Sequence, residues 1–278
     1  MIKIMRFIKN KLYLVFFLIT AGPLFAEKSA VSETLFHHIL NNDKLELFPF
    51  LPPIKLPFNI TVHQLMLFIA VALIIILFSI AARKNSLRPG KMQISIETII
   101  LFIRDDVVYP VMGKEKGKKW MSFFTSLFVF LVVVNLLGLI PAFKTATGNI
   151  NVTSAMAVIV FLLTFIVGFK EIGVAHFFKN LLPEGAPLPI AIFVALLEFV
   201  SIFTRSAVLS LRLFANMFAG HLAILSFLVL LFVVSPFFGF IAVPFAVFTY
   251  TLEVLIAFLQ AFVFTLLSCI FISMASSH

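Results

Sequence analysis

The sequence predicts an all-α integral membrane protein with about five transmembrane helices, the last two forming a long tilted hairpin. Of the 278 residues, 62% are hydrophobic and only 12% are charged. Soluble domains are typically about 45–50% apolar and about 25% charged. The apolar residues form runs long enough to cross a bilayer as helices. Basic residues gather beside alternate runs, as the positive-inside rule requires, so the net charge of +9 indicates topology and no nucleic-acid surface.

The first 26 residues have the pattern of a secretory signal peptide. Four basic residues precede an apolar run from Leu12 to Ala21, and small or helix-breaking residues continue to Ala26. An uncleaved signal anchor is the alternative, because Leu24 is larger than usual at the third position before the cut. In both cases we expect residues 27–61 outside the cytoplasm, with an extended or irregular, proline-rich entry to the first mature helix.

Three spans are expected before the hairpin. The first covers residues 62–82, and the following segment to residue 120 carries nine Lys and Arg residues, which places it in the cytoplasm. Within that segment, residues 92–112 are apolar but interrupted by charges, which favours a helix at the membrane interface. Spans over residues 122–142 and 153–169 run outward and back inward.

The last third of the chain contains two unusually long apolar arms, residues 190–233 and 237–274. The first arm has no proline and one glycine, and about 45 helical residues measure roughly 65 Å. The hydrocarbon core is only about 30 Å thick. Cutting each arm into two ordinary spans is the alternative, but "TRSAVLSLRLF" holds no turn residues. We therefore expect two steeply tilted helices, with the Val234–Gly239 turn outside rather than inside.

Charged side chains are scarce in this third, and four occur from Pro187 onward. Ionisable residues within spans are functional by default, because lipid exposure is so costly. Arg205, near a helix end, is also explained by a structural ion pair or by snorkelling to the interface. Arg212 has no carboxylate one turn away, so we expect its partner on another chain. The four charged residues are Glu198, Arg205, Arg212 and Glu253.

Helical geometry sorts the polar residues of the arms onto faces. At 100° per residue, Asn216 lies on the face of Arg212, whereas His221 lies on the opposite face. On the second arm, Glu253 and Gln260 are seven residues apart and share a face. We therefore expect His221 to face a partner such as Glu253.

The stretch "LRLFANMFAGH" resembles the signature of subunit a of F-type ATP synthases, the membrane stator of a proton-driven rotor. Four further segments match that family in the same order and spacing, and the resemblance covers roughly residues 35–278. They are "RPGKMQISIE", "NLLGLIPA", "NVTSAMA" and "LQAFVFTLLSCIFISMA".

The resemblance implies a mechanism and partners. Subunit a packs its hairpin against a ring of c subunits, each with a membrane-embedded carboxylate, and provides two offset aqueous half-channels for protons. Arg212 would be the essential arginine facing that ring, and His221 with Glu253 the polar pair of the outer channel. Asn216, Gln260 and Glu198 would line the path, Glu198 on the exit side. Arg205 stands where the family usually has a basic residue.

The resemblance also implies a non-catalytic subunit, with no cofactor and no metal. Many members of the family begin without a cleavable signal, and the signal-peptide pattern here suggests a bacterial plasma (inner) membrane. The hairpin and the four-span alternative both leave the C-terminus in the cytoplasm. Its partners would be the c-ring, the peripheral-stalk subunit b, protons and lipid. The alternative is a secondary ion-coupled transporter, which would show internal repeats and half-helices broken near mid-membrane. A membrane metalloenzyme would need clustered ligands such as "HExxH", which is absent. Na⁺ in place of H⁺ stays open.

Overall fold

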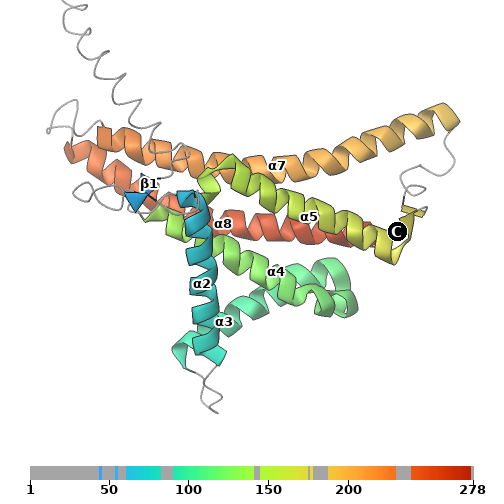
Figure 1. Cartoon of the computed structure of the whole chain (residues 1–278), viewed down its shortest axis with the longest axis horizontal. Coiled ribbons are helices and arrows are strands. Elements are labelled where there is room, and N and C mark those ends of the chain that lie inside the picture. Colours follow the sequence, from blue (N-terminus) through green and yellow to red (C-terminus); the bar gives the residue numbers. More distant parts are fainter. Residues whose placement is uncertain are drawn as a thin grey trace, which may run out of the picture.

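A computed structural model describes residues 44–45, 54–55, 61–82, 90–140, 145–174, 176–177, 187–229 and 239–276. The expected signal peptide and the centre of the turn between the two arms lie outside these residues. The elements, shown in Figure 1, are β1 (Lys44–Leu45), β2 (Ile54–Lys55), α2 (Val62–Ala82), α3 (Lys91–Phe102), the π-helix η2 (Ile103–Val108), α4 (Tyr109–Leu139), the 3-10 helix η3 (Ala146–Gly148), α5 (Ile150–Glu171), α7 (Leu188–Val229) and α8 (Gly239–Ser276).

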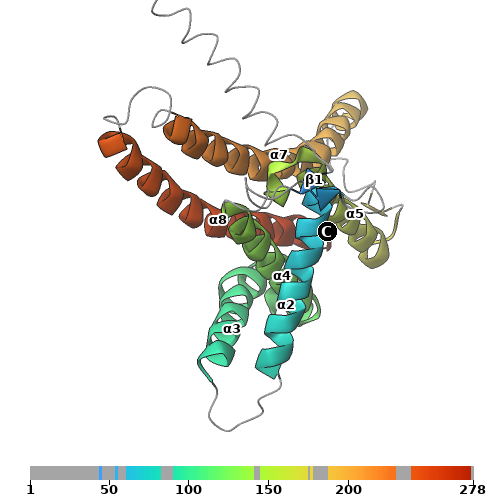
Figure 2. The ribbon, with the colours of Figure 1, turned by 60° about the vertical axis from the view of Figure 1, so that its left-hand side comes forward.

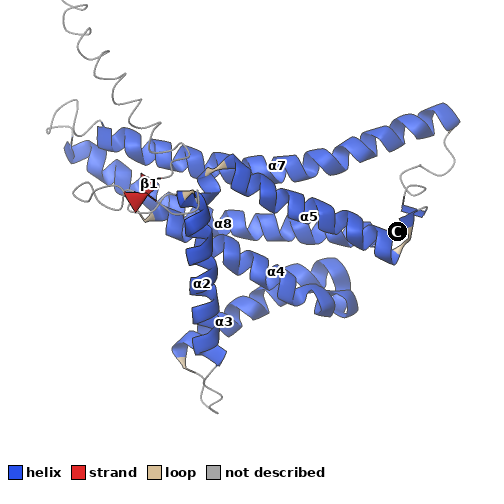
Figure 3. Cartoon of the chain, in the orientation of Figure 1, coloured by secondary structure: helices blue, strands red, loops and turns tan. Residues whose placement is uncertain are grey.

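The expected all-α fold class is confirmed. Helices make up nearly all of the described chain (Figure 3), and its sheet consists of β1 and β2, paired antiparallel over two residues each. Within the described ranges, five helices are long and apolar enough to cross a membrane. The chain is therefore a multi-pass membrane protein.

The long helices pack side by side around a common apolar core. Helices α5, α7 and α8 run alongside one another, and α4 packs on α8 (Figure 1). Helix α2 stands across the direction of α8 in both views (Figure 2). If α2 is near the bilayer normal, the hairpin is steeply inclined. The core of the bundle includes Phe124, Leu131, Leu209, Leu213, Phe264 and Ile272, all at most 2% exposed.

The two arms are each one continuous helix. Helix α7 runs for 42 residues through "TRSAVLSLRLF" without interruption, and α8 returns for 38 residues. Pro244 lies in the second turn of α8, and its missing N–H removes one intrahelical hydrogen bond near the start of the helix. The two helices pack against each other along the hairpin, which confirms the hairpin and leaves no break at which α7 would divide into two spans.

The segment expected as an interfacial helix, residues 92–112, is helical but not uniform. Helix α3 has no buried residue, whereas η2 buries Ile103, Val107 and Val108. Helix α4 then begins at Tyr109 and contains a non-helical residue, Gly113, with φ of 75°. A positive φ is accessible to glycine without steric cost. Gly113 divides α4, and the part that reaches Leu139 follows this residue and begins before the expected span at residue 122. The π-helical turn η2 packs the preceding segment on the core.

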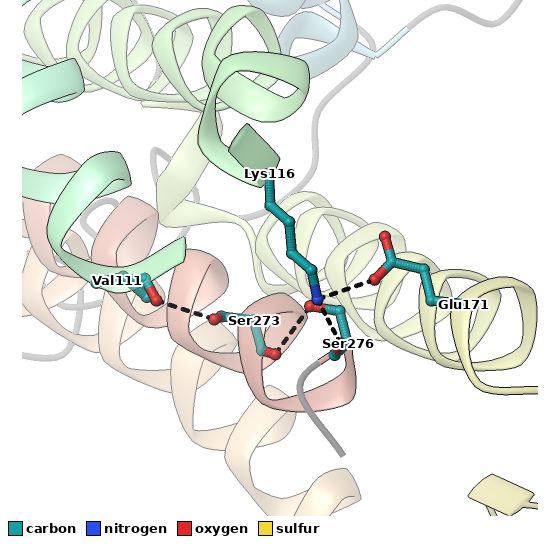
Figure 4. A network of polar contacts seen from close by, with 5 residues as sticks. All are labelled: Val111, Lys116, Glu171, Ser273 and Ser276. Atoms are coloured by element: carbon teal, nitrogen blue, oxygen red, sulfur yellow. Dashed lines mark hydrogen bonds and ion pairs between the residues drawn. The ribbon is translucent and has the colours of Figure 1, made fainter. Parts of the chain in front are cut away.

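The C-terminal end of α8 is tied to two other helices by a group of polar contacts, which we call the C-terminal clamp (Figure 4). The Lys116 ammonium donates to the Ser276 carbonyl at 2.6 Å and lies 3.3 Å from a Glu171 carboxylate oxygen. The Ser273 hydroxyl donates to the Val111 carbonyl at 3.0 Å. The end of α8 is thus fixed to α4 and α5.

Candidate functional site

Helix α7 has one open face and one packed face. Exposed and buried residues each recur at spacings of three and four, which is the periodicity of helix faces. Arg212 is partly exposed and lies at the border between the two faces. The exposed series is Thr204, Val208, Leu211, Ala215 and Ala219, and the buried series is Ser206, Leu209, Leu213 and Met217.

Arg212 has no hydrogen bond or ion pair with any residue that the structure describes, and Asn216, one turn further on, has none either. A guanidinium keeps its proton at any ordinary pH. At the centre of a membrane helix, such a charge costs about 2.5–3.5 kcal/mol on the translocon scale. Nothing in the described chain offsets that cost, and Arg212 borders an open apolar face.

Contacts among three hydroxyl groups join α7 to α5 just before this arginine. The Ser210 hydroxyl lies 3.2 Å from the hydroxyl of Thr153 and 3.2 Å from that of Ser154. Ser210 is on the buried face of α7. These contacts fix the rotation of α7 about its axis, and the same rotation directs Arg212 toward the border of the open face.

Glu198 and Arg205 pair with each other. A guanidinium nitrogen of Arg205 donates to a Glu198 carboxylate oxygen at 3.1 Å, and both side chains are partly exposed. Exposed ion pairs of this kind contribute at most about 1 kcal/mol. The pairing agrees with the interpretation of Arg205 as a member of a structural ion pair. Arg212, by contrast, has no such partner in the described chain.

His221 and Glu253 are brought together, as their helical faces suggested. The His221 Nε2 atom lies 4.0 Å from a Glu253 carboxylate oxygen, and the side chains are 27% and 2% exposed. Neither oxygen of Glu253 accepts a hydrogen bond from a described residue. Gln260 lies on the same buried face of α8, so this face carries a carboxylate and an amide.

Gly220 makes room for this carboxylate. An ideal β-carbon at Gly220 would lie 2.8 Å from Cδ of Glu253 and would also overlap its nearer oxygen. Real β-carbons do not approach other heavy atoms so closely. The Glu253 carboxylate can therefore lie beside residue 220 of α7 only because that residue is a glycine.

Sequence reasoning missed two further residues: Thr145, which contacts His221, and His63, which contacts Thr145. The Thr145 hydroxyl is hydrogen-bonded to His221 Nε2 and donates to the Gly138 carbonyl at 3.1 Å. Nδ1 of His63, in the first turn of α2, lies 3.2 Å from the Thr145 carbonyl oxygen. We call His63, Thr145, His221 and Glu253 the buried polar cluster. The available signal was a histidine at the edge of the first apolar run.

Asn135 is a third residue that the sequence analysis did not select. It is completely buried in α4; its amide donates to the Ala257 carbonyl at 3.2 Å and accepts from the Thr147 hydroxyl at 2.9 Å. It therefore joins α4, η3 and α8 one turn of α8 beyond Glu253. An amide inside the apolar run "VVVNLLGL" was the signal that could have identified it. In the described part of the chain, no three His, Cys, Asp or Glu residues are grouped to hold a metal ion.

Known proteins resemble this chain over most of its length. Residues 64–273 match the family model described as ATP synthase A chain. The chain is 37% identical to ATP synthase subunit a of Pelodictyon phaeoclathratiforme over 261 residues, covering 88% of the chain and 76% of the relative. It is 38% identical to ATP synthase subunit a of Chloroherpeton thalassium over 255 residues, covering 87% and 76%. The extent of these matches shows that the chain belongs to the ATP synthase subunit a family.

Proposed function

We propose that this chain is the proton-translocating stator subunit of a bacterial F-type ATP synthase. It supplies two aqueous half-channels and an arginine, Arg212, that faces the carboxylates of the c-ring. It couples proton flow to rotation, and it performs no catalysis by itself. The observation that carries the proposal is a permanent charge without a partner in the described chain, at the border of an open apolar face.

The chemistry of Arg212 suits a moving counter-charge. A fixed guanidinium stabilises the ionised form of a carboxylate that comes close, and so lowers its proton affinity. A protonated c subunit that reaches Arg212 therefore releases its proton on the exit side. Because the guanidinium cannot accept that proton, it also blocks direct proton leakage between the two half-channels. The apolar residues flanking it, such as Val208 and Leu211, would pack against the ring.

The entry half-channel is assigned to the buried face of the hairpin. His221 and Glu253 lie 4.0 Å apart, close enough to exchange a proton directly after a small movement or through one water molecule. Asn216 and Gln260 supply amides that can orient water along the path. A proton from the outer aqueous phase would pass this pair and protonate a c carboxylate.

The exit half-channel is assigned to the start of α7, where Glu198 lies partly exposed beside Arg205. The orientation follows from the positive-inside rule, which places the basic segment before residue 120 in the cytoplasm. Lys116 of that segment binds the Ser276 carbonyl, which supports a cytoplasmic C-terminus. With this orientation, the chain would lie in the bacterial inner membrane with its C-terminus in the cytoplasm. Subunit b of the peripheral stalk would be a further partner.

The test is proton uptake by membrane vesicles that carry Arg212→Ala in the assembled complex, driven by ATP. We expect coupled pumping and ATP synthesis to be lost while the complex still assembles. Arg104→Ala is the control, since it removes the same charge from a residue that has a partner, Asp105, and that is not assigned to the proton path. The proposal is wrong if Arg212→Ala pumps as well as Arg104→Ala in complexes of equal subunit content.

A further inference from the structure

His63 is a buried histidine remote in sequence from the hairpin. It lies in the first turn of α2, is 3% exposed, and adjoins an apolar cluster formed by α2, α4 and η3. Its Nδ1 atom lies 3.2 Å from the Thr145 carbonyl oxygen. A carbonyl oxygen only accepts, so Nδ1 of His63 carries the hydrogen in this contact.

Thr145 links His63 to His221 and determines which nitrogen of His221 carries the hydrogen. The Thr145 hydroxyl donates its single proton to the Gly138 carbonyl. Its oxygen is therefore the acceptor in the hydrogen bond with His221, and Nε2 of His221 is the donor. Gly138 permits this close placement, because a β-carbon there would lie 2.6 Å from Cγ2 of Thr145 and 2.9 Å from its hydroxyl oxygen.

The position of that hydrogen determines how His221 can act. With hydrogen on Nε2, the neutral ring can accept a proton at Nδ1. Nε2 then releases its own proton to Glu253, 4.0 Å away, after a small movement that breaks the hydrogen bond with Thr145. One proton enters the ring and one leaves to the carboxylate, so protons balance. The ring is left with its hydrogen on Nδ1, and the Thr145 oxygen favours the return of hydrogen to Nε2.

We propose that His63 is a positioning residue for proton transfer, which holds the Thr145 carbonyl so that the Thr145 hydroxyl orients His221 toward Glu253. This role rests on the proton-translocating function proposed above. It requires the N–H donor of His63 rather than its volume. Among the described residues, the ionisable group that faces His221 from α8 is Glu253, and α2 contributes His63 through Thr145.

Two substitutions separate the hydrogen bond from packing. In His63→Asn, the amide nitrogen can occupy the place of Nδ1 and donate to the same carbonyl, although the side chain is smaller. In His63→Leu, similar volume is kept but the donor is lost. In the assembled complex in vesicles, we expect ATP-driven pumping to stay within about twofold for His63→Asn and to fall about tenfold for His63→Leu. A tenfold fall corresponds to the loss of one hydrogen bond, at the upper end of the usual range of hydrogen-bond free energies.

A second readout follows His221 without depending on pumping. Diethyl pyrocarbonate modifies unprotonated imidazole nitrogens, and mass spectrometry of the peptide containing His221 gives the modification rate and its dependence on pH. We expect His63→Leu to change this rate several-fold and His63→Asn to keep the unsubstituted rate. Equal rates and equal pumping for the two variants would overturn the positioning role, as would a stronger loss in His63→Asn than in His63→Leu.

The outcomes distinguish this proposal from the proposed function. If Arg212→Ala still pumps, the proposed function fails, whereas the dependence of His221 modification on residue 63 still tests the contact. If Arg212→Ala abolishes pumping and residue 63 alters neither readout, the positioning role alone fails. Should His63→Leu not assemble, Thr145→Ser and Thr145→Val replace the pair. Retained pumping in the serine variant and loss in the valine variant support the step from the Thr145 hydroxyl to His221, on which the role of His63 depends, and equal behaviour contradicts the proposal.

Discussion

The buried polar cluster and the C-terminal clamp are both built from polar side chains between helices, but they differ in how completely those side chains are satisfied. In the clamp, Lys116 and Glu171 are partly exposed, and they bind each other and the Ser276 carbonyl. In the cluster, Glu253 is 2% exposed, its nearer oxygen lies 4.0 Å from His221 Nε2, and neither oxygen accepts a hydrogen bond from a described residue.

This difference indicates a structural role for the clamp and a functional role for the cluster. A buried polar group without a hydrogen bond costs about 1–3 kcal/mol, so Glu253 weakens the fold, whereas the clamp joins α4, α5 and α8 at little cost. Retention of a destabilising group is typical of functional sites. Substitutions in the clamp should therefore alter stability, and substitutions in the cluster should alter proton transfer.

The largest effect is expected for Glu253→Gln. The amide keeps the shape of the side chain but cannot carry the proton, and loss of a positioned acid–base group costs about 100-fold or more in rate. ATP-driven proton uptake by vesicles measures it, and the melting temperature of the purified complex should not fall. Glu171→Gln is the control, with pumping near the unsubstituted level. Similar losses in the two variants would contradict the comparison.

Gly220→Ala should have the next largest effect. The added methyl group would overlap the Glu253 carboxylate, and overpacking of this kind costs about 1–3 kcal/mol. We expect pumping to fall about tenfold, because 1.4 kcal/mol corresponds to a factor of ten in rate. Gly90→Ala is the matched control, since a β-carbon there meets no atom within 4 Å. Unchanged pumping in Gly220→Ala would show that the carboxylate can move aside freely.

Asn135→Leu should act mainly on stability. It removes the hydrogen bonds with Ala257 and Thr147 from a fully buried position, and it leaves partners unsatisfied at a cost of about 1–3 kcal/mol. The melting temperature of the solubilised complex measures the change. Asn151→Leu, at an exposed residue, should change it little. Equal melting temperatures for the two variants would show that the buried amide does not join α4, η3 and α8.

The smallest effect is expected for Lys116→Met. A partly exposed ion pair contributes about 1 kcal/mol or less and is screened by salt. The melting temperature should fall slightly at low ionic strength and recover toward the unsubstituted value at high salt, with pumping within about twofold. Lys118→Met, at an exposed lysine of the same helix, is the control. A tenfold loss of pumping in Lys116→Met would move the clamp from a structural to a functional role.

Hydropathy and the absence of turn residues were sufficient to predict the fold class and the two long arms. Runs of apolar residues report directly on burial in lipid, and "TRSAVLSLRLF" offers the backbone no place to turn. The break at Gly113 falls beside the expected end of the interfacial helix at residue 112. The start of the next helix before residue 122 was missed, because the charged residues after Gly113 lower the hydropathy there. The π-helical turn at Ile103–Val108 was missed because its apolar residues also fit an α-helical pattern.

The candidate site also contains residues that the sequence predicted and residues that it did not. Helical periodicity predicted that His221 and Glu253 could face each other, because both lie in long regular helices. Thr145 follows the end of α4 in a connection without periodicity, and His63 begins a helix distant in sequence. Their approach to His221 depends on how α2 and α4 pack, and on the missing side chain at Gly138. A single sequence does not contain that information.

The contact between Gly220 and Glu253 also has a consequence for sequence evolution. The Glu253 side chain fills the space between α7 and α8 that a side chain at position 220 would need. A larger residue at position 220 therefore needs a shorter acid, aspartate, at position 253, which keeps the carboxylate that proton transfer requires. Substitutions at these two positions should therefore be inherited together, and a double exchange should survive where either single exchange does not.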